Sequence, residues 1–304
     1  MRAARGTPRA GQFARLFIIG DPVLHSLSPE MQAGALARSG LRGAYVPIHA
    51  RPRDLANAVR ALETLGFLGG NITIPHKEKV LPLLVRVSER AAAIGAANCL
   101  ARGRGGFVGD NTDGLGFRDA VEARGGARLR GCRVLLVGAG GAARAVLHAA
   151  VEAGAAEVLI VNRTMGRARA LARDAAAWGS ARIAAAPFSD LAALAAARRG
   201  GGARERFDIV INATSLGLAP TDRSPLPVGV LRCARVACDL VYARRETRFV
   251  HDARANGLRT IDGIDILAAQ GVRSFESWFG RAPTRQFMVR EARAAWTRRQ
   301  SHSE

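Results

Sequence analysis

A glycine-rich turn between an apolar run and a helical stretch constrains the fold of this chain more than any other feature. The run Val134-Leu-Leu-Val137 passes directly into Gly138-Ala-Gly-Gly-Ala-Ala143, and an alanine-rich helical stretch follows. The glycines at 138 and 140 permit a tight turn and the close approach of a pyrophosphate, while a small residue at 143 lets helix pack on strand. The helix N-terminus attracts the anion. The pattern predicts a dinucleotide-binding βαβ unit.

Strand-like and helix-like stretches alternate along most of the chain. Short apolar runs predict strands at 16–19, 44–48, 70–74, 134–137, 158–161 and 208–211. Ser28 is expected to cap a helix that begins at Pro29, and a second helix is expected over 54–65. The segment 181–206 is interpreted as helix and loop, and apolar spacing predicts helices over 265–299. This alternation predicts an α/β fold with mainly parallel sheets.

Length and composition indicate a soluble protein with two domains. The 304 residues suffice for two cores, and 48% of them are hydrophobic and 23% charged. No apolar run approaches the ~18 residues that a membrane span needs, so no membrane partner is expected. The basic segment 1–14 lacks the apolar centre of a secretory signal and is interpreted as a disordered extension. The four cysteines and six histidines fit no metal-binding spacing, so we expect a cytoplasmic protein with reduced thiols and no structural metal.

The formal charge of +20 is compatible with two classes of partner. A positive field attracts nucleic acid, and it also concentrates small anionic substrates. Aromatic residues make up only 5% of the chain and the arginines are spread along it, so most of the charge is interpreted as a solvated surface. No nucleic-acid partner is therefore expected. A nucleic-acid-binding protein is the alternative, and it predicts steeply salt-dependent DNA binding.

The residues after the second strand of the dinucleotide unit indicate which nicotinamide it takes. Enzymes that use NAD place an acid there for the ribose 2′-hydroxyl. This chain instead has Asn162-Arg163-Thr164, with Arg167 one turn further on. Guanidinium and hydroxyl donors suit a 2′-phosphate, so NADP(H) is favoured as the cofactor. Ordinary surface arginines are the alternative explanation in a chain this rich in arginine.

Lysine is almost absent from the chain. Of the 45 basic residues only Lys77 and Lys79 are lysines. Arginine keeps its charge at any accessible pH, whereas a lysine can give up its proton and act as an acid or base. The segment 71–79 is therefore a candidate for proton transfer, with chance retention of two surface lysines as the alternative.

Seven polar or glycine-rich clusters follow one another between residues 17 and 280. They are His25-Ser-Leu-Ser28-Pro, Asn71-x-Thr73-x-Pro-His-Lys77, Gly95-Ala-Ala-Asn98 with Gly109-Asp-Asn-Thr-Asp113-Gly, Gly138-Ala-Gly-Gly, Asn162-Arg-Thr, Asn212-Ala-Thr-Ser215 and Gly263-x-x-x-Leu-x-x-Gln270-Gly. In this order they resemble the shikimate dehydrogenase family. The resemblance implies reversible NADPH-dependent reduction of 3-dehydroshikimate to shikimate, a step in the biosynthesis of chorismate and aromatic amino acids. Relatives acting on quinate or an amino-shikimate, or accepting NAD, are the nearest alternatives.

The resemblance also implies roles for single residues. Lys77 and Asp113 would form the catalytic pair, with an ammonium protonating the alkoxide that hydride delivery creates. The substrate would contact Ser26 and Ser28 through its carboxylate, Thr73, Asn98 and Gln270 through its ring hydroxyls, and Tyr242 near the carboxylate. The cofactor would contact Gly138, Ala139, Gly140, Gly141, Ala142, Asn162, Arg163, Thr164, Arg167, Thr214 and Gly263. Lys79 would be solvated.

A domain arrangement follows from the same resemblance. A substrate domain over 1–112 would be completed by C-terminal helices over 263–304, and a Rossmann-like NADP-binding domain would occupy 113–262. The active site would then lie in the cleft between the domains of a monomer or homodimer. Three departures from the family pattern, Cys99, Arg248 and Asp265, leave the substrate preference open.

Overall fold

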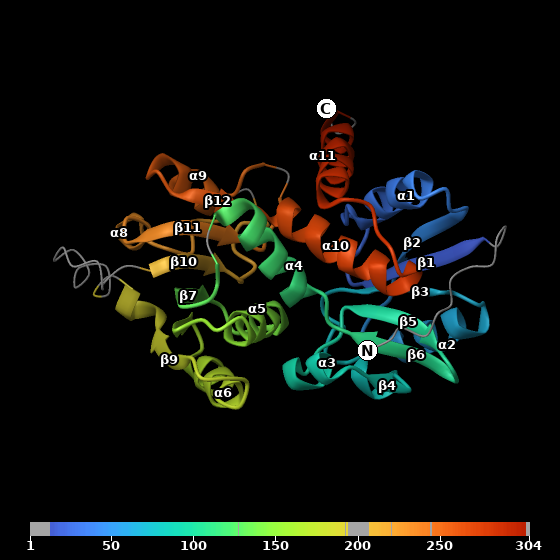
Figure 1. The fold of residues 1–304 in the computed structure, drawn as a ribbon, viewed down its shortest axis with the longest axis horizontal. Helices are drawn as coiled ribbons and strands as arrows, with labels where there is room; N and C mark the ends of the chain where they lie inside the picture. Colours follow the sequence, from blue (N-terminus) through green and yellow to red (C-terminus); the bar gives the residue numbers. More distant parts are fainter. Residues whose placement is uncertain are drawn as a thin grey trace. The chain divides into compact units, whose positions relative to one another are not determined.

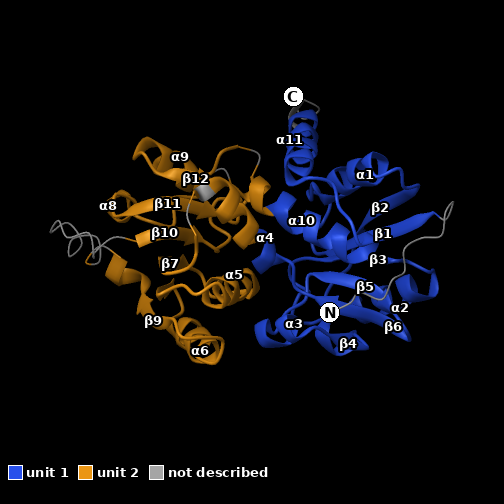
Figure 2. Cartoon of the chain, in the orientation of Figure 1, with its two compact units in different colours: residues 1–116, 267–304 blue, residues 117–266 orange. Residues whose placement is uncertain are grey.

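A computed structural model describes residues 13–126, 128–191, 193, 207–219, 221–243 and 245–301. The chain divides into two compact units, which Figure 2 shows in different colours. Unit 1 comprises residues 1–116 and 267–304, and unit 2 comprises residues 117–266. Residues 1–12 of the predicted basic extension and most of 192–206 lie outside the described residues.

Unit 1 contains a six-stranded mixed sheet with the strand order β2-β1-β3-β5-β6-β4. The strand β1 pairs in parallel with both β2 and β3, whereas β5 runs antiparallel to β3 and β6. The strands are β1 (Ala14–Gly20), β2 (Gly43–His49), β3 (Gly69–Ile72), β4 (Arg86–Val87), β5 (Cys99–Gly103) and β6 (Gly106–Asp110). The helices of unit 1, labelled in Figure 1, are α1 (Ser28–Arg38), α2 (Leu55–Thr64), α3 (Glu89–Ile94) and α11 (Arg285–Ser301). Two further helices, α4 (Asp113–Ala120) and α10 (Gly263–Phe279), belong partly to unit 1 and partly to unit 2. The short turn η1 (Leu81–Leu83) precedes β4.

The C-terminal helix α10 is anchored to the sheet of unit 1. Trp278 donates its indole N–H to the carbonyl of Leu100 on β5 at 2.9 Å. Gly69 makes this approach feasible, because a Cβ at that position would lie 2.3 Å from the Leu100 carbonyl oxygen and 2.7 Å from Trp278 Nε1. The opposite face of the sheet packs against α2, and its core includes the aromatic pair Phe17 and Phe107, whose ring centroids lie 5.5 Å apart in an edge-to-face arrangement.

Unit 2 contains a six-stranded, wholly parallel sheet with the order β12-β11-β10-β7-β8-β9. The strands are β7 (Arg133–Val137), β8 (Glu157–Asn162), β9 (Arg182–Pro187), β10 (Phe207–Asn212), β11 (Ala234–Asp239) and β12 (Arg259–Ile261). The other elements are η2 (Val121–Gly125), α5 (Gly141–Glu152), α6 (Met165–Ala175), η3 (Phe188–Asp190), α8 (Val228–Leu231) and α9 (Arg248–Ala255).

The strand order of unit 2 is that of a doubly wound dinucleotide-binding sheet. The chain moves outward from β7 through β8 to β9, and outward in the other direction from β10 through β11 to β12. Because such crossovers are right-handed, α5 and α6 cover one face of the sheet and α8 and α9 the other (Figure 1). The order reverses between β7 and β10, where ligands bind in folds of this type. The predicted α/β fold is confirmed, with a wholly parallel sheet in unit 2 and a mixed sheet in unit 1.

Two local predictions were wrong. The segment 182–187 is the strand β9 and not helix or loop, because all six residues pair with the open edge of β8 and this pairing overrides the helix propensity of alanine. Ser28 does not cap α1, since Leu27 is the capping residue and makes no side-chain bond. Ser26 Oγ instead accepts the backbone N–H of Ser28 at 3.2 Å.

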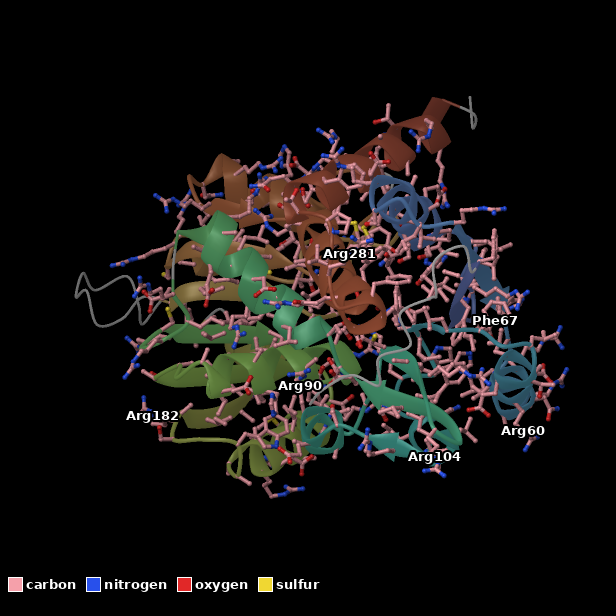
Figure 3. All side chains as sticks on the ribbon, turned by 45° about the vertical axis from the view of Figure 1, so that its right-hand side comes forward. Arg60, Phe67, Arg90, Arg104, Arg182 and Arg281 are labelled. Atoms are coloured by element: carbon pink, nitrogen blue, oxygen red, sulfur yellow. The ribbon has the colours of Figure 1, made fainter. Side chains whose placement is uncertain are left out.

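The arginine side chains account for the charged surface of both units. Arg60, Arg104 and Arg182, which are labelled in Figure 3, are exposed. Arg90 differs because its side chain is only 26% exposed and its guanidinium donates to Asp110 at 2.7 Å. Most arginines therefore face water, as the sequence interpretation expected, and a few are structural.

Asp239, at the end of β11, is a buried carboxyl group in unit 2. It accepts hydrogen bonds from Thr247 Oγ1 at 2.5 Å, from Asn212 Nδ2 at 2.9 Å and from the N–H of Val241 at 3.0 Å. Burial nevertheless dominates and raises the pKa of Asp239 from 3.8 to about 6. Between these two values the folded state binds a proton that the unfolded state has released.

The stabilisation by neutral Asp239 should therefore be lost as the pH rises through about 6. Relative to Asp239→Asn, which cannot titrate, the wild type should lose about 2 kcal/mol of unfolding free energy between pH 4.5 and 7.5. Urea unfolding of both proteins at the two pH values measures this difference. A difference that does not change with pH would contradict the assignment.

Candidate active site

Lys77 and Asp113 form an ion pair in unit 1. Lys77 Nζ donates to Asp113 Oδ2 at 2.6 Å, and each side chain is 18% exposed. Lys77 follows β3, and Asp113 is the first residue of α4. The carbonyl of Lys77 accepts the N–H of Ala97 at 2.8 Å, which holds the lysine segment beside the segment that carries Asn98. The structure thus brings the two predicted catalytic residues together.

Asn98 holds the carboxylate of Asp113 from its other side. Asn98 Nδ2 donates to Asp113 Oδ1 at 2.7 Å. The amide orientation of Asn98 is fixed, because its Oδ1 accepts the backbone N–H of Thr112 at 2.7 Å and lies 3.2 Å from Thr112 Oγ1. With both oxygens of Asp113 engaged by donors, the carboxylate is an acceptor with a defined position.

Gln270 joins this cluster from α10. Its Oε1 lies 3.4 Å from both Asn98 Nδ2 and Thr112 Oγ1, and its Nε2 donates to the carbonyl of Leu267 at 3.0 Å. Gly116 on α4 permits the contact, because a Cβ there would lie 2.4 Å from the backbone nitrogen of Gln270. Residues 77, 98, 113 and 270 therefore form one hydrogen-bonded group within unit 1.

Sequence reasoning assigned no role to Thr112 or Ser274, which complete the group. Ser274 is fully buried, lies 3.1 Å from Thr112 Oγ1 and accepts from Asn71 Nδ2 at 2.9 Å. Asn71 in turn accepts the hydroxyl of Tyr45 at 2.8 Å. A signal was present for Ser274, because it follows Gln270 by four residues and so shares its helix face.

The predicted substrate residues Ser26, Ser28 and Thr73 are not part of this hydrogen-bonded group, and their own bonds go to other residues. Ser26 and Ser28 are buried, and the bond from the Ser28 N–H to Ser26 Oγ ties them together. Thr73 is half-buried just beyond β3, and its N–H donates to the carbonyl of Ile19 at 2.9 Å. Lys79 is exposed, as expected of a solvated side chain.

The glycine-rich loop of unit 2 has the geometry that a pyrophosphate needs. Gly138 has a φ of +119°, and a Cβ there would lie 2.6 Å from the carbonyl oxygen of Ala213. A Cβ at Gly140 would meet no atom within 4 Å, so the space beside it is open. Gly140 caps α5 without a side-chain bond, so the first N–H groups of the helix, at Gly141 and Ala142, lack a side-chain cap. The loop, including Ala139, therefore fits the phosphates of a dinucleotide.

The residues after β8 fit a 2′-phosphate. Asn162 Nδ2 donates to the carbonyl of Thr164 at 2.9 Å and shapes the turn. Arg163, Thr164 and Arg167 are exposed, and in the described part of the chain neither arginine forms an ion pair. The nearby Arg144, by contrast, is bound to Asp174 at 2.7 Å. Two unneutralised guanidinium groups beside an open turn suit an anion.

The remaining predicted cofactor and substrate residues of unit 2 are held by local contacts. Thr214 Oγ1 donates to Asn212 Oδ1 at 2.7 Å and accepts the N–H of Leu216 at 3.1 Å. Gly263 lies against the chain before Tyr242, because a Cβ at Gly263 would be 2.4 Å from the carbonyl oxygen of Val241. Tyr242 is half-buried.

The three departures from the family pattern have structural explanations. Asp265 is buried and lies 3.2 Å from the guanidinium of Arg124 within unit 2. Arg248 binds Asp252 at 2.8 Å along α9. Burial raises the pKa of the Cys99 thiol to about 12, so this thiol is neutral at physiological pH. All four cysteines are buried and unbridged.

A cavity of about 490 Å³ in unit 2 lies away from these residues. It is lined by Gly126, Arg128, Cys132, Asp208, Arg235, Val236 and Arg259. The strand residues among them are at the amino ends of β10, β11 and β12, whereas the glycine-rich loop follows the carboxyl end of β7. None of the predicted site residues lines this cavity, so it is not the candidate site.

Among the described residues, no group of three or more His, Cys, Asp and Glu side chains could hold a metal ion. No helix in that part of the chain is long and apolar enough to cross a membrane.

Two family descriptions match the two halves of this architecture. Residues 18–100 match the shikimate dehydrogenase substrate binding domain, and residues 120–219 match the shikimate / quinate 5-dehydrogenase description. A relative from Rhodospirillum rubrum named shikimate dehydrogenase (NADP(+)) is 43% identical over 270 residues, which are 88% of this chain and 92% of the relative. The chain belongs to the shikimate dehydrogenase family.

Other members of the shikimate dehydrogenase family are similar to this chain over almost its whole length. A Geobacter metallireducens protein with the same name is 40% identical over 289 residues, 95% of this chain and 99% of that protein. The crystal structure of shikimate 5-dehydrogenase from Thermus thermophilus, solved with NADP(H) and shikimate, superposes with a TM-score of 0.80 at 39% identity. That comparison covers 93% of this chain and 99% of the other.

The close approach at Gly116 yields a prediction about stability. Gly116→Ala should lower the free energy of unfolding by about 2 kcal/mol, because the new methyl group overlaps the backbone of Gln270. Gly166→Ala on α6 is the matched control, since a Cβ there meets no atom within 4 Å. It should be neutral or stabilising by roughly 0.5 kcal/mol. Urea unfolding measures both, and equal midpoints would refute the packing argument.

Proposed function

We propose that this chain catalyses the reversible NADPH-dependent reduction of 3-dehydroshikimate to shikimate, a step in chorismate biosynthesis. The observation that carries the proposal is the Lys77–Asp113 pair at 2.6 Å, with Asn98 holding the second carboxylate oxygen at 2.7 Å. Relatives named shikimate dehydrogenase (NADP(+)) and the Thermus thermophilus structure with NADP(H) and shikimate support the same reaction.

We assign each partner of the reaction mainly to one of two parts of the chain. The substrate domain would cover 1–112 with the helices of 263–304, and the NADP-binding domain would cover 113–262. Ser26 and Ser28 would bind the carboxylate together with Tyr242, while Thr73, Asn98 and Gln270 would bind ring hydroxyls. The cofactor would contact Gly138, Ala139, Gly140, Gly141, Ala142, Asn162, Arg163, Thr164, Arg167, Thr214 and Gly263.

Lys77 is suited to deliver the proton. Bound NADPH supplies a hydride to the ketone carbon. An ammonium group has three N–H donors, and Asp113 uses one of those on Lys77. The other two remain for the ketone oxygen, where they stabilise the developing negative charge and protonate it. Asp113 accepts from both Lys77 and Asn98, so its role is to orient the lysine and to accept from a substrate hydroxyl.

We also infer a cytoplasmic protein that acts as a monomer or homodimer on this small-molecule substrate. Four buried, unbridged cysteines support a reducing compartment. Light scattering of the purified protein distinguishes the two oligomeric states.

The reaction is tested by following reduced-nicotinamide absorbance with shikimate or quinate, each with NADP⁺ or NAD⁺. Turnover should be dominated by shikimate with NADP⁺. Lys77→Ala should lower kcat by roughly 10²- to 10⁴-fold, the usual contribution of a general acid. Lys77→Arg should also be impaired, because a guanidinium does not release its proton.

Lys79→Ala is the control for these lysine variants, since Lys79 is exposed and should leave kcat unchanged. Circular dichroism confirms that each variant is folded. Turnover of quinate alone, or full activity in Lys77→Ala, would overturn the substrate and the catalytic assignment respectively.

The preference for NADP⁺ should depend on the turn after β8. Arg163→Gln should raise the KM for NADP⁺ about tenfold, because a charge-assisted bond to the 2′-phosphate is lost, and should leave the KM for NAD⁺ nearly unchanged. Arg169→Gln serves as the control, because Arg169 is an exposed residue of the helix α6 that follows the turn. Equal effects on both cofactors would rule out a 2′-phosphate contact.

A further inference from the structure

The segment between β1 and α1 carries Ser26 and has little regular structure to hold it, and Ser28 follows as the first residue of α1. Its backbone is tied by the N–H of Asp21 to the carbonyl of Ile74 at 3.0 Å, and by the N–H of Ser26 to the carbonyl of Val23 at 3.0 Å. Beyond Ser26, the Ser28 N–H donates to Ser26 Oγ at 3.2 Å and the Met31 N–H donates to the carbonyl of Leu27 at 3.1 Å. These two bonds stay within the segment and the first turn of α1, so contacts from elsewhere in unit 1 are also needed to hold the two serines in place.

Arg299, near the end of α11, supplies those contacts. Its Nη2 donates to the carbonyl of Ser26 at 2.9 Å, and its Nη1 donates to the carbonyl of Leu24 at 3.3 Å. Its Nε donates to Glu30 Oε1 at 2.8 Å. A single guanidinium thus binds the segment before Ser26, at Ser26 and after Ser28.

The helix α11 holds Arg299 at a defined position against α1. Met288, Ala292 and Ala295 are buried, and with Arg299 they lie at intervals of four, three and four residues on one helix face. A Cβ at Gly34 would lie 2.7 Å from Glu291 Oε2, so residue 291 lies beside residue 34, while residue 299 lies beside residue 30. The two helices are antiparallel, and this places the end of α11 at the start of α1.

A guanidinium is required for this set of bonds. The three acceptors lie around all three nitrogens of a planar fork with five N–H donors, and Nη2 is shared between the Ser26 carbonyl and Glu30 Oε1, which lies 2.5 Å from it. An ammonium is a single point and cannot span the carbonyls of Leu24 and Ser26 while it also binds Glu30. Loss of the fork leaves those carbonyls without this partner, whereas Lys77 and Asp113 keep their own bonds.

We propose that Arg299 is a positioning residue for substrate binding: it holds the Ser26–Ser28 segment in place for the carboxylate of the substrate. The inference rests on the proposed function, in which these serines bind that carboxylate. Arg299 acts through the backbone of the segment and through Glu30, so its removal should weaken ground-state binding of the acid and leave the chemical step intact.

The test compares the steady-state kinetics of the wild type, Arg299→Ala and Arg299→Lys with NADP⁺. Arg299→Ala should raise the KM for shikimate about tenfold, since bonds from a charged donor are lost, while kcat and the KM for NADP⁺ stay near the wild-type values. Arg299→Lys should raise the KM to a similar extent. Arg290→Ala on the same helix is the matched control, because Arg290 is exposed and stacks on Phe287, and should change none of these constants.

Shikimate methyl ester separates positioning from a general loss of structure. The ester keeps a carbonyl acceptor but lacks the carboxylate charge, so Arg299→Ala should raise its KM by a smaller factor than the KM for shikimate. An unchanged KM for shikimate in both Arg299 variants, or an equal rise for the ester, would overturn the proposal. Arg299→Lys serves as the readout if Arg299→Ala does not fold. A wild type that is inactive with shikimate would instead overturn the proposed function on which the inference rests.

Discussion

The Asp113 carboxylate, with Lys77 on one oxygen and Asn98 on the other, is the interaction around which unit 1 is organised. A buried polar group needs partners, and each partner here needs others in turn. The network therefore extends through Thr112 to Ser274 on α10. The geometry of this one ion pair therefore depends on several elements of unit 1, namely the ends of strands, the start of α4 and the helix α10.

In unit 2 the corresponding constraint is the close packing of two backbone segments, rather than a network of charged side chains. Gly138 brings the loop after β7 against the carbonyl of Ala213, which follows β10. These two strands are the pair at which the sheet order reverses. A side chain is excluded at Gly138, and the helix α5 that follows begins without a side-chain cap, so backbone N–H groups are exposed there. Unit 1 is thus organised by bonded side chains, whereas this part of unit 2 is organised by backbone.

The sequence predicted those parts of the structure that depend on local pattern. Continuous apolar runs identified β7, β8 and β10, and the motif residues Lys77, Asn98, Asp113 and Gln270 do form one hydrogen-bonded group. The strand β9 was missed because alanines favour a helix until the edge of β8 is present. Arg299 was missed because nearly all of the 45 basic residues are arginine, so composition hides the one that binds the backbone at Leu24 and Ser26.

The scarcity of lysine has a consequence for chemical labelling. Amine-selective reagents that act on side chains find only Lys77 and Lys79, and these differ sharply in accessibility, because the Lys77 side chain is 18% exposed and bonded whereas Lys79 is exposed. In most enzymes of this size an acylating probe reacts with many surface lysines at once. In this chain the slower of the two lysine acylation rates would report on a single half-buried amine, without any substitution of the sequence.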